Sequence, residues 1–156
     1  MNDETMRAKG EGAAGRMRLR VVPERCTGCI SCMLACSVAK TGAFSLDEAR
    51  IRIDRNPHEG LFTPSVCRQC DEAWCVQACP VSALTRDEGG IIRVDEETCI
   101  GCRACVEACP YQGVAWNETT GKPLFCDLCD GDPACVRACR FPKAISLVEG
   151  EKDEQI

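Results

Sequence analysis

Hydrophobic residues in this chain occur in short runs separated by polar segments. The first run, residues 17–22 (MRLRVV), alternates with polar residues and predicts a short strand. Similar runs predict strands at 50–54, on either side of a Gly-Gly turn within 81–99, on either side of a Thr-Gly turn within 114–125, and at 144–149. The pattern therefore predicts short strands, several of them joined as hairpins.

Other segments lack such runs. Residues 1–16 are rich in Gly, Ala and charge, and we expect a flexible tail there, while the acidic residues 150–156 are expected to fray. Residues 37–66 form the longest gap between cysteine groups. Besides the strand at 50–54, this gap predicts a helical turn at 37–44 and a loop at 55–64. His58, the one histidine of the chain, lies in this loop and is expected to be exposed.

Composition shows that an ordinary apolar core would be thin. Hydrophobic residues make up 45% of the 156 residues, but this class includes 16 cysteines, and aromatic residues make up only 4%. So many cysteines indicate a scaffold held by disulfides or by metal. The first twenty residues contain no apolar run typical of a signal peptide or a membrane span, so we expect a cytoplasmic protein without direct membrane insertion. In that compartment clustered cysteines usually bind metal.

The cysteines form four groups of four. The third group, from Cys99 to Pro110, has the C-x2-C-x2-C-x3-C-P spacing of bacterial ferredoxins, in which thiolates bind iron–sulfur clusters. The first group has the same spacing with Ser37 in place of proline, and the second and fourth groups have a wider gap after their second cysteine. The four groups together form an internal repeat that uses every cysteine.

The fourth cysteine of such a run ligates a neighbouring cluster instead of its own. Sixteen thiolates divide evenly into four [4Fe–4S] clusters. Because the second and third groups are adjacent, we expect them to exchange ligands with each other, which leaves the first and fourth groups to do the same. The predicted ligands are Cys67, Cys70, Cys75 and Cys109 for cluster A; Cys99, Cys102, Cys105 and Cys79 for cluster B; Cys26, Cys29, Cys32 and Cys139 for cluster C; and Cys126, Cys129, Cys135 and Cys36 for cluster D.

This pairing predicts an α+β, loop-rich fold of two nested ferredoxin-like dicluster modules with short β-hairpins and short helices. The inner module covers residues 67–110. The outer module is split into 17–66 and 111–149, so that the two ends of the chain meet.

Charge and motifs narrow the function. The net charge is −5, and four clusters at about −2 each bring it to roughly −13, so a nucleic-acid partner is not expected. No nucleophile motif, phosphate loop or dinucleotide fingerprint is present. We therefore expect a non-catalytic protein that passes single electrons. A zinc-stabilised interaction module is a remote alternative, because three cysteines within seven residues suit a single tetrahedral ion poorly. The cysteine count also leaves open a three-iron cluster at one site.

The order of the groups and the phrases VCRQCDEAWCVQACPVSAL, CIGCRACVEACPYQGV and FCDLCDGDPACVRAC resemble the four-cluster iron–sulfur subunits that accompany molybdenum and tungsten enzymes, including the iron–sulfur subunits of aldehyde oxidoreductase and DMSO reductase. The resemblance covers roughly residues 19–148. It implies that the chain connects a large catalytic subunit with a molybdenum or tungsten pterin to a second redox carrier, such as a flavoprotein or a ferredoxin.

The resemblance favours an aldehyde oxidoreductase as the catalytic partner. The chain is short for this family, without the long insertions and C-terminal anchor helix of its larger membrane-linked members, and a compact soluble relay is therefore expected. Formate dehydrogenase, CO dehydrogenase, hydrogenase and benzoyl-CoA reductase are alternative partners. A free polyferredoxin without a fixed partner, and copies of the chain stacked into a longer wire, are further alternatives.

Overall fold

A computed structural model of the chain describes residues 16–140 and 143–149, so the expectations for a flexible tail and a frayed C-terminus concern residues that lie outside the described ranges. The strands are β1 (Met17–Val21), β2 (Arg52–Asn56), β3 (Leu61–Ser65), β4 (Leu84–Arg86), β5 (Ile92–Val94), β6 (Ala115–Asn117), β7 (Lys122–Leu124) and β8 (Ile145–Glu149). The helices are α1 (Ser31–Thr41), α2 (Trp74–Ala78), α3 (Ala104–Glu107) and α4 (Ala134–Ala138), with 3₁₀ turns η1 (Pro23–Arg25), η2 (Leu46–Glu48) and η3 (Leu128–Gly131).

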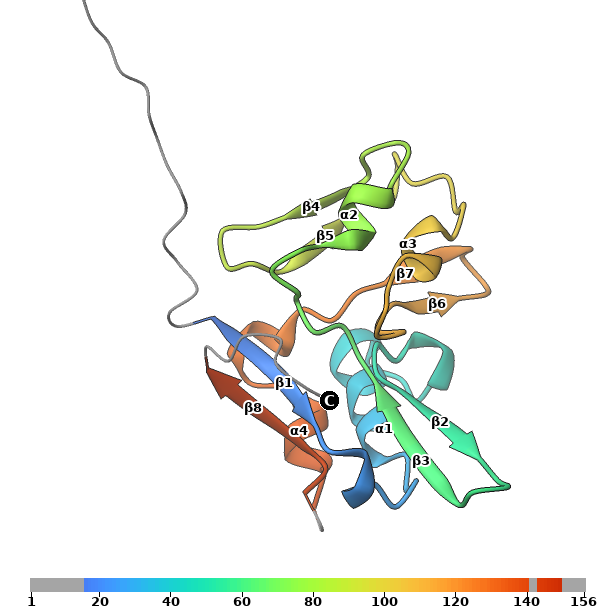
Figure 1. The fold of residues 1–156 in the computed structure, drawn as a ribbon, viewed down its shortest axis with the longest axis vertical. Coiled ribbons are helices and arrows are strands. Elements are labelled where there is room, and N and C mark those ends of the chain that lie inside the picture. The colour runs from blue at the N-terminus through green and yellow to red at the C-terminus, as the bar shows by residue number, and fades with distance from the viewer. Residues whose placement is uncertain (1–15, 141–142, 150–156) are drawn as a thin grey trace, which may run out of the picture.

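The first and last described strands pair with each other. β1 and β8 form an antiparallel two-stranded sheet in which Leu19 lies opposite Leu147 and Val21 opposite Ile145. The alternation expected from the sequence is present from Leu19 to Val21, where both hydrophobic residues are buried and Arg20 between them is exposed, but Arg18 departs from it because it is buried too. Figure 1 shows this pair as a blue strand beside a red one. The predicted strands at both ends are therefore confirmed, and they hold the two ends of the described chain together.

Three hairpins make up the other sheets: β2–β3, β4–β5 and β6–β7. The second and third were predicted at their Gly-Gly and Thr-Gly turns. The first differs from the expectation, because the predicted loop at 55–64 contains most of β3. Pro64 within that strand argued against it, but proline is tolerated where its missing N–H faces no partner, as in a two-stranded sheet. His58 lies exposed in the turn of this hairpin.

Helix α1 begins earlier than predicted and is longer. It starts at Ser31, inside the first cysteine group, and continues past Cys36 to Thr41. The residue after Cys36 is Ser37, whose hydroxyl donates to the carbonyl of Leu34 at 2.9 Å within the helix. In the second and third groups a proline follows the fourth cysteine, and proline disfavours helical backbone at the residue before it. The missing proline permits α1 to continue where α2 and α3 end, but it is not sufficient by itself, because in the fourth group Arg140 follows Cys139 and α4 still ends at Ala138.

The helices pack in two pairs. α1 packs against α4, and α2 packs against α3. In the view of Figure 1, the first pair lies low in the molecule with β1, β8 and the β2–β3 hairpin, and the second pair lies at the top with β4 and β5. Residues from both ends of the chain therefore build one part, and its middle builds the other.

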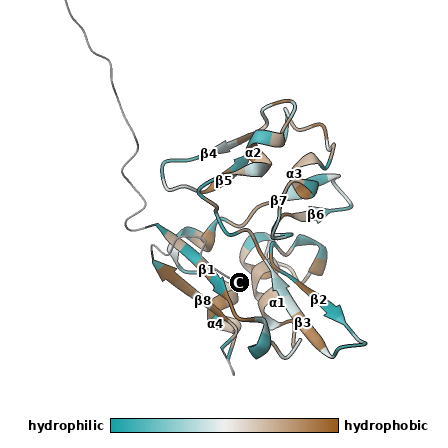
Figure 2. Ribbon diagram, viewed as in Figure 1, coloured by the Kyte–Doolittle hydropathy of each residue, from teal (hydrophilic) through white to brown (hydrophobic). Residues whose placement is uncertain are grey.

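Cysteine supplies much of the buried interior. Six of the nineteen buried residues that form the described core are cysteines, namely Cys32, Cys36, Cys67, Cys105, Cys126 and Cys135. Figure 2 shows hydrophobic residues spread over loops as well as helices and strands. A core this small and this rich in thiols leaves much of the stability to whatever the thiols bind.

The β1–β8 pair offers a test of how much the apolar residues contribute. Ile145 is 2% exposed, so Ile145→Ala should lower the free energy of unfolding by about 2–5 kcal/mol, and Ile145→Val by about 0.5–1.5 kcal/mol. Thermal unfolding of the anaerobic holoprotein measures the order of the midpoints. The control is Arg20→Ala on the exposed side of β1, and equal midpoints for this control and Ile145→Ala would contradict the assignment.

Candidate iron–sulfur sites

Left-handed backbone shapes the cysteine loops. In the first group Gly28 has φ 68° and Ile30 has φ 58°, and in the third group Gly101 and Arg103 repeat this with φ 69° and 64°. These turns lie between successive cysteines and direct their side chains toward one site. A regular helix or strand could not do this. A side chain at Gly28 has no room either, since its Cβ would lie 2.5 Å from the ring of Phe62.

Helices place the other cysteines. In every group the third cysteine lies in the first turn of a helix, and the fourth follows four residues later. Because α1 packs on α4 and α2 on α3, the helical cysteines of the first and fourth groups come together, as do those of the second and third. These are the pairs of groups for which the sequence predicts ligand exchange.

Cysteines line three of the cavities that the described residues form. The largest, about 210 Å³, has walls that include Cys26, Cys29, Cys32 and Cys139. A narrower cleft of about 20 Å³ is lined by Cys79, Cys99, Cys102 and Cys105. Another of about 20 Å³ is lined by Cys67, Cys70, Cys75 and Cys109. We call these sites C, B and A after the predicted clusters, whose cysteine sets they match; that each set ligates one cluster remains a prediction.

The remaining four cysteines also lie together. Burial, together with the nearby charges of Cys36 and Cys129, raises the pKa of the Cys126 thiol to about 12. Burial likewise raises the pKa of Cys135, with contributions from Cys126, Cys36 and Cys129. We call this set site D.

The burial and the mutual proximity of these thiols suit the binding of a group that contains metal cations. Burial raises the pKa of Cys32 and Cys67 to about 12 and that of Cys105 to about 11, and neighbouring cysteines add to each shift. Four thiolates gathered in such surroundings repel one another unless positive charge lies between them. Iron supplies that charge and deprotonates its thiol ligands, so the residues present fit an iron–sulfur cluster.

The four exchanged cysteines share one further feature, which is a backbone N–H that donates to the sulfur. The donors to Cys79, Cys109 and Cys139 follow four or five residues later in the chain, each at 3.3 Å. The donor to Cys36, also at 3.3 Å, is Arg50, fourteen residues later. Arg50 is the exception because α1 continues past Cys36. The chain does not turn directly after this cysteine and comes back to its sulfur only after η2.

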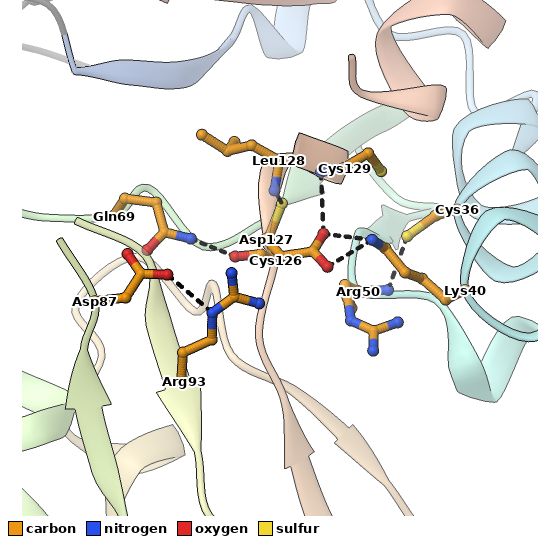
Figure 3. A network of polar contacts seen from close by, with 10 residues as sticks. All are labelled: Cys36, Lys40, Arg50, Gln69, Asp87, Arg93, Cys126, Asp127, Leu128 and Cys129. Carbon is orange, nitrogen blue, oxygen red and sulfur yellow. Dashed lines mark hydrogen bonds and ion pairs between the residues drawn. The ribbon is translucent and has the colours of Figure 1, made fainter. Parts of the chain in front are cut away.

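Contacts between the sites place them in a row. Besides burial, the charge of Cys126 in site D raises the pKa of Cys67 in site A. The amide of the fully buried Gln69 joins the same two loops, donating to the carbonyl of Cys126 (Figure 3) and accepting from the N–H of Ile92 at 3.0 Å. Charge contributions between cysteines also connect site D to site C and site A to site B.

Site D also adjoins site C, since the charge of Cys32 contributes to the raised pKa of Cys135. Site A adjoins site B, because after burial the charge of Cys75 is the largest contribution to the raised pKa of Cys105. The sites thus follow one another in the order C, D, A, B. At the two ends of this row lie Cys29 of site C and Cys102 of site B, the two exposed cysteines.

The surroundings of the two end sites differ in charge. Arg25 and Arg140 line the site C cavity, are exposed, and have no ion-pair partner within the described ranges. At the other end, Asp95, Glu96 and Glu97 immediately precede the site B loop and are all exposed. One end of the row is therefore basic and the other acidic.

Several polar residues near the sites were not singled out from the sequence. Lys40 of α1 bonds both carboxylate oxygens of Asp127, at 2.5 and 2.6 Å, and Asp127 accepts the N–H of Cys129 at 3.0 Å. Asp127 stands between two cysteines and could have been noticed for that reason. Arg50 and Gln69 carried no such signal, because their contacts depend on which loops the fold brings together.

Trp74 and Arg18 both lie at the second cysteine group. Trp74 is 36% exposed, lines the site A cleft and meets the ring of Tyr111 in an edge-to-face arrangement. Arg18 is buried and bonds Asp71 at 2.6 Å, a residue of the second cysteine group's loop. This ion pair ties β1 to the middle of the chain.

Two features are absent from the described residues. No three His, Cys, Asp or Glu side chains in the described ranges are arranged to hold a single metal ion. No helix in those ranges is long and apolar enough to cross a membrane.

The matches to curated relatives cover about half of this chain. A subunit of tetrathionate reductase from Archaeoglobus fulgidus is 38% identical over 51% of this chain and 39% of its own length. A polyferredoxin-like subunit of aliphatic sulfonate oxidoreductase from Pyrococcus furiosus is 39% identical over 57% and 51%, and a thiosulfate reductase electron transfer subunit from Salmonella typhi is 39% identical over 51% and 44%. The chain therefore spans about half or less of the length of these relatives.

Solved structures and family matches extend the comparison. A chain in the active site complex BamBC of benzoyl coenzyme A reductase superposes with a TM-score of 0.53 at 24% identity, covering 90% of this chain and 81% of its own, which supports a small ferredoxin-like fold of short strands and few helices. Residues 23–39 match a 4Fe-4S binding domain. These matches and the sixteen cysteines are consistent with four [4Fe–4S] clusters. Since residues 58–149, more than half of the chain, match the 4Fe-4S dicluster domain, the chain belongs to that family.

Proposed function

We propose that this chain is an electron-transfer subunit that carries electrons one at a time through four [4Fe–4S] clusters between a catalytic partner and a second redox carrier. The observation that carries the proposal is the row of four cysteine sets, C, D, A and B, with one exposed cysteine at either end. When bound, each cluster accepts and releases one electron. The names of the relatives, which describe subunits of reductases and oxidoreductases, support a non-catalytic role.

In this proposal the residues of the chain have three tasks. The cysteines of each set ligate one cluster, with Cys109 closing site A, Cys79 site B, Cys139 site C and Cys36 site D. The backbone N–H groups that donate to these four sulfurs stabilise negative charge on them, which is one of the ways a protein sets a cluster's potential. The helix pairs and the β1–β8 sheet keep successive sites adjacent.

For the catalytic partner we propose a large subunit with a molybdenum or tungsten pterin. The aldehyde oxidoreductase remains the favoured partner on the resemblance of the cysteine phrases. The benzoyl-CoA reductase is the second candidate, favoured by the fold it shares over nearly the whole chain. A free polyferredoxin would have no such partner.

For the second carrier we propose a small protein with an acidic surface beside its redox group, bound at the site C end. Arg25 and Arg140 flank the exposed Cys29, and their charge would attract such a surface and orient it toward the cavity. Ferredoxins and flavodoxin-type flavoproteins belong to this chemical class.

Iron and acid-labile sulfide analysis tests the clusters themselves. Anaerobically purified protein should contain about sixteen irons and as many sulfides per chain. Cys67→Ser and Cys109→Ser should each disturb the same cluster, so that the double variant loses no more iron than the single variants. Zinc without sulfide would exclude the proposal, and iron losses that add in the double variant would exclude the assignment of both cysteines to site A.

Anaerobic affinity purification tests the catalytic partner. The full-length protein, tagged and isolated from its own cells, should bring down a large subunit that contains molybdenum or tungsten, detectable by metal analysis and mass spectrometry. A size-exclusion profile with only the free chain would favour the polyferredoxin alternative, whereas a ladder of larger species made of this chain alone would indicate stacking.

The basic end can be tested by charge reversal. Arg25→Glu combined with Arg140→Glu should slow reduction or oxidation of the holoprotein by an acidic ferredoxin about tenfold at low salt, and the difference should shrink as salt is added. The two reversals are also tested one at a time. Arg93→Glu on β5 makes the same change of charge away from site C and is the control for each single variant. Equal rates for all variants at low salt would place the carrier elsewhere.

A further inference from the structure

Beside site D lies Arg50, a cation that makes no ion pair within the described ranges. Arg50 lies directly before the buried Ile51, and its backbone N–H donates to the sulfur of Cys36 at 3.3 Å. Its Nη1 atom is buried and has no hydrogen-bond partner among the described residues. A buried guanidinium nitrogen without an acceptor is costly, so such an atom is expected to face a group that completes the site when bound.

The neighbouring charges do not fill this role. Lys40 and Asp127 bond each other through both carboxylate oxygens, so these two charges cancel. Arg50 is close enough to both to help lower the pKa of Asp127 and to oppose the raised pKa of Lys40. Figure 3 shows the three side chains beside Cys36 and Cys129, two of the four cysteines of site D. Arg50 is thus the unbalanced positive charge at the edge of the site.

The other sites contain cations in different arrangements. At site A the guanidinium of Arg86 donates to the carbonyl oxygen of Cys70, and at site B the ammonium group of Lys122 donates to the carbonyl oxygen of Cys99. Both therefore have acceptors in the protein. At site C, Arg25 and Arg140 are exposed, and water screens their charge.

We propose that Arg50 is the charge partner of the cluster at site D and raises the reduction potential of that cluster. The inference rests on the proposed function, because it requires a cluster at site D. A [4Fe–4S] cluster with four thiolates has a charge of about −2, and uptake of one electron adds one further negative charge without making or breaking a bond. A fixed positive charge on a half-buried side chain stabilises the more negative state more strongly, so it favours reduction.

Arg50 has this position because α1 continues past Cys36 to Thr41, whereas the helices of the other groups end before their fourth cysteine. In the other groups the N–H donor to the fourth cysteine comes from the turn that follows directly, and those donors are Ala83, Gly113 and Ala144, which have no charge. At Cys36 the helix continues, and the donor is supplied by a residue with a cationic side chain. One residue thus provides both the hydrogen bond to sulfur and the charge beside the site.

The test is a redox titration of the anaerobic holoprotein, monitored by EPR, with dithionite as the reductant. Arg50→Gln keeps the backbone N–H and removes the charge, and it should lower one of the four midpoint potentials by about 59 mV or more, a tenfold change in a one-electron equilibrium constant. Arg50→Lys should restore most of the potential. The control is Arg52→Gln, whose guanidinium bonds the carbonyls of Leu46, Asp47 and Trp116 and no residue of site D, and it should leave the midpoint of the site D cluster unchanged.

The shifted midpoint should belong to the cluster whose EPR signal Cys129→Ser alters. Four unchanged midpoints in an Arg50→Gln protein that contains sixteen irons would overturn the inference and leave the proposed function intact. A wild-type protein without iron and sulfide would overturn the proposed function instead. If Arg50→Gln loads fewer irons, Arg50→Lys decides, because wild-type iron content and potentials support the role of charge, whereas a loss equal to that of the glutamine variant overturns it.

Discussion

The structure depends on a spacing of four residues between two cysteines on a short helix. Such a pair projects from one face, and in ferredoxin-type runs the fourth cysteine ligates a neighbouring cluster, so each helix is expected to pack on another that carries the complementary pair. α1 on α4 and α2 on α3 are the two solutions seen here. The hairpins, the Gln69 bridge and the Arg18–Asp71 ion pair then fix how the two packed pairs lie against each other.

Much of this arrangement could be predicted from spacing alone. Cysteine positions determine which groups must meet, and alternation with turn residues located β1, β8 and two of the hairpins. The extent of α1 and the β2–β3 hairpin could not be predicted, because one depended on the effect of Ser37 on the helix and the other on Pro64 being tolerated in a two-stranded sheet. Contacts that join distant loops, such as those of Arg50, are visible only once the fold is known.

Clusters in a row need not be equivalent. Sites A and D, in the middle of the row, are formed by the two cysteine groups with widened gaps, and their Cys67 and Cys126 are buried. Sites B and C, at the ends, each have one exposed cysteine. Exposure, nearby charge and hydrogen bonds to sulfur all affect cluster potentials, so the sites at the ends and in the middle of the row provide different surroundings for a cluster.

The pairing of β1 with β8 has a consequence for how the protein is made. Leu19 pairs with Leu147, so the first strand emerges from the ribosome without its partner and waits until the segment between these two residues has been synthesised. With chain growth at about 5–20 residues per second, that interval lasts roughly ten seconds. During this time the first cysteine group is exposed to oxidants and to stray metal ions. The middle of the chain, whose two helices are close in sequence, can assemble first and give the late-arriving ends a surface on which to close.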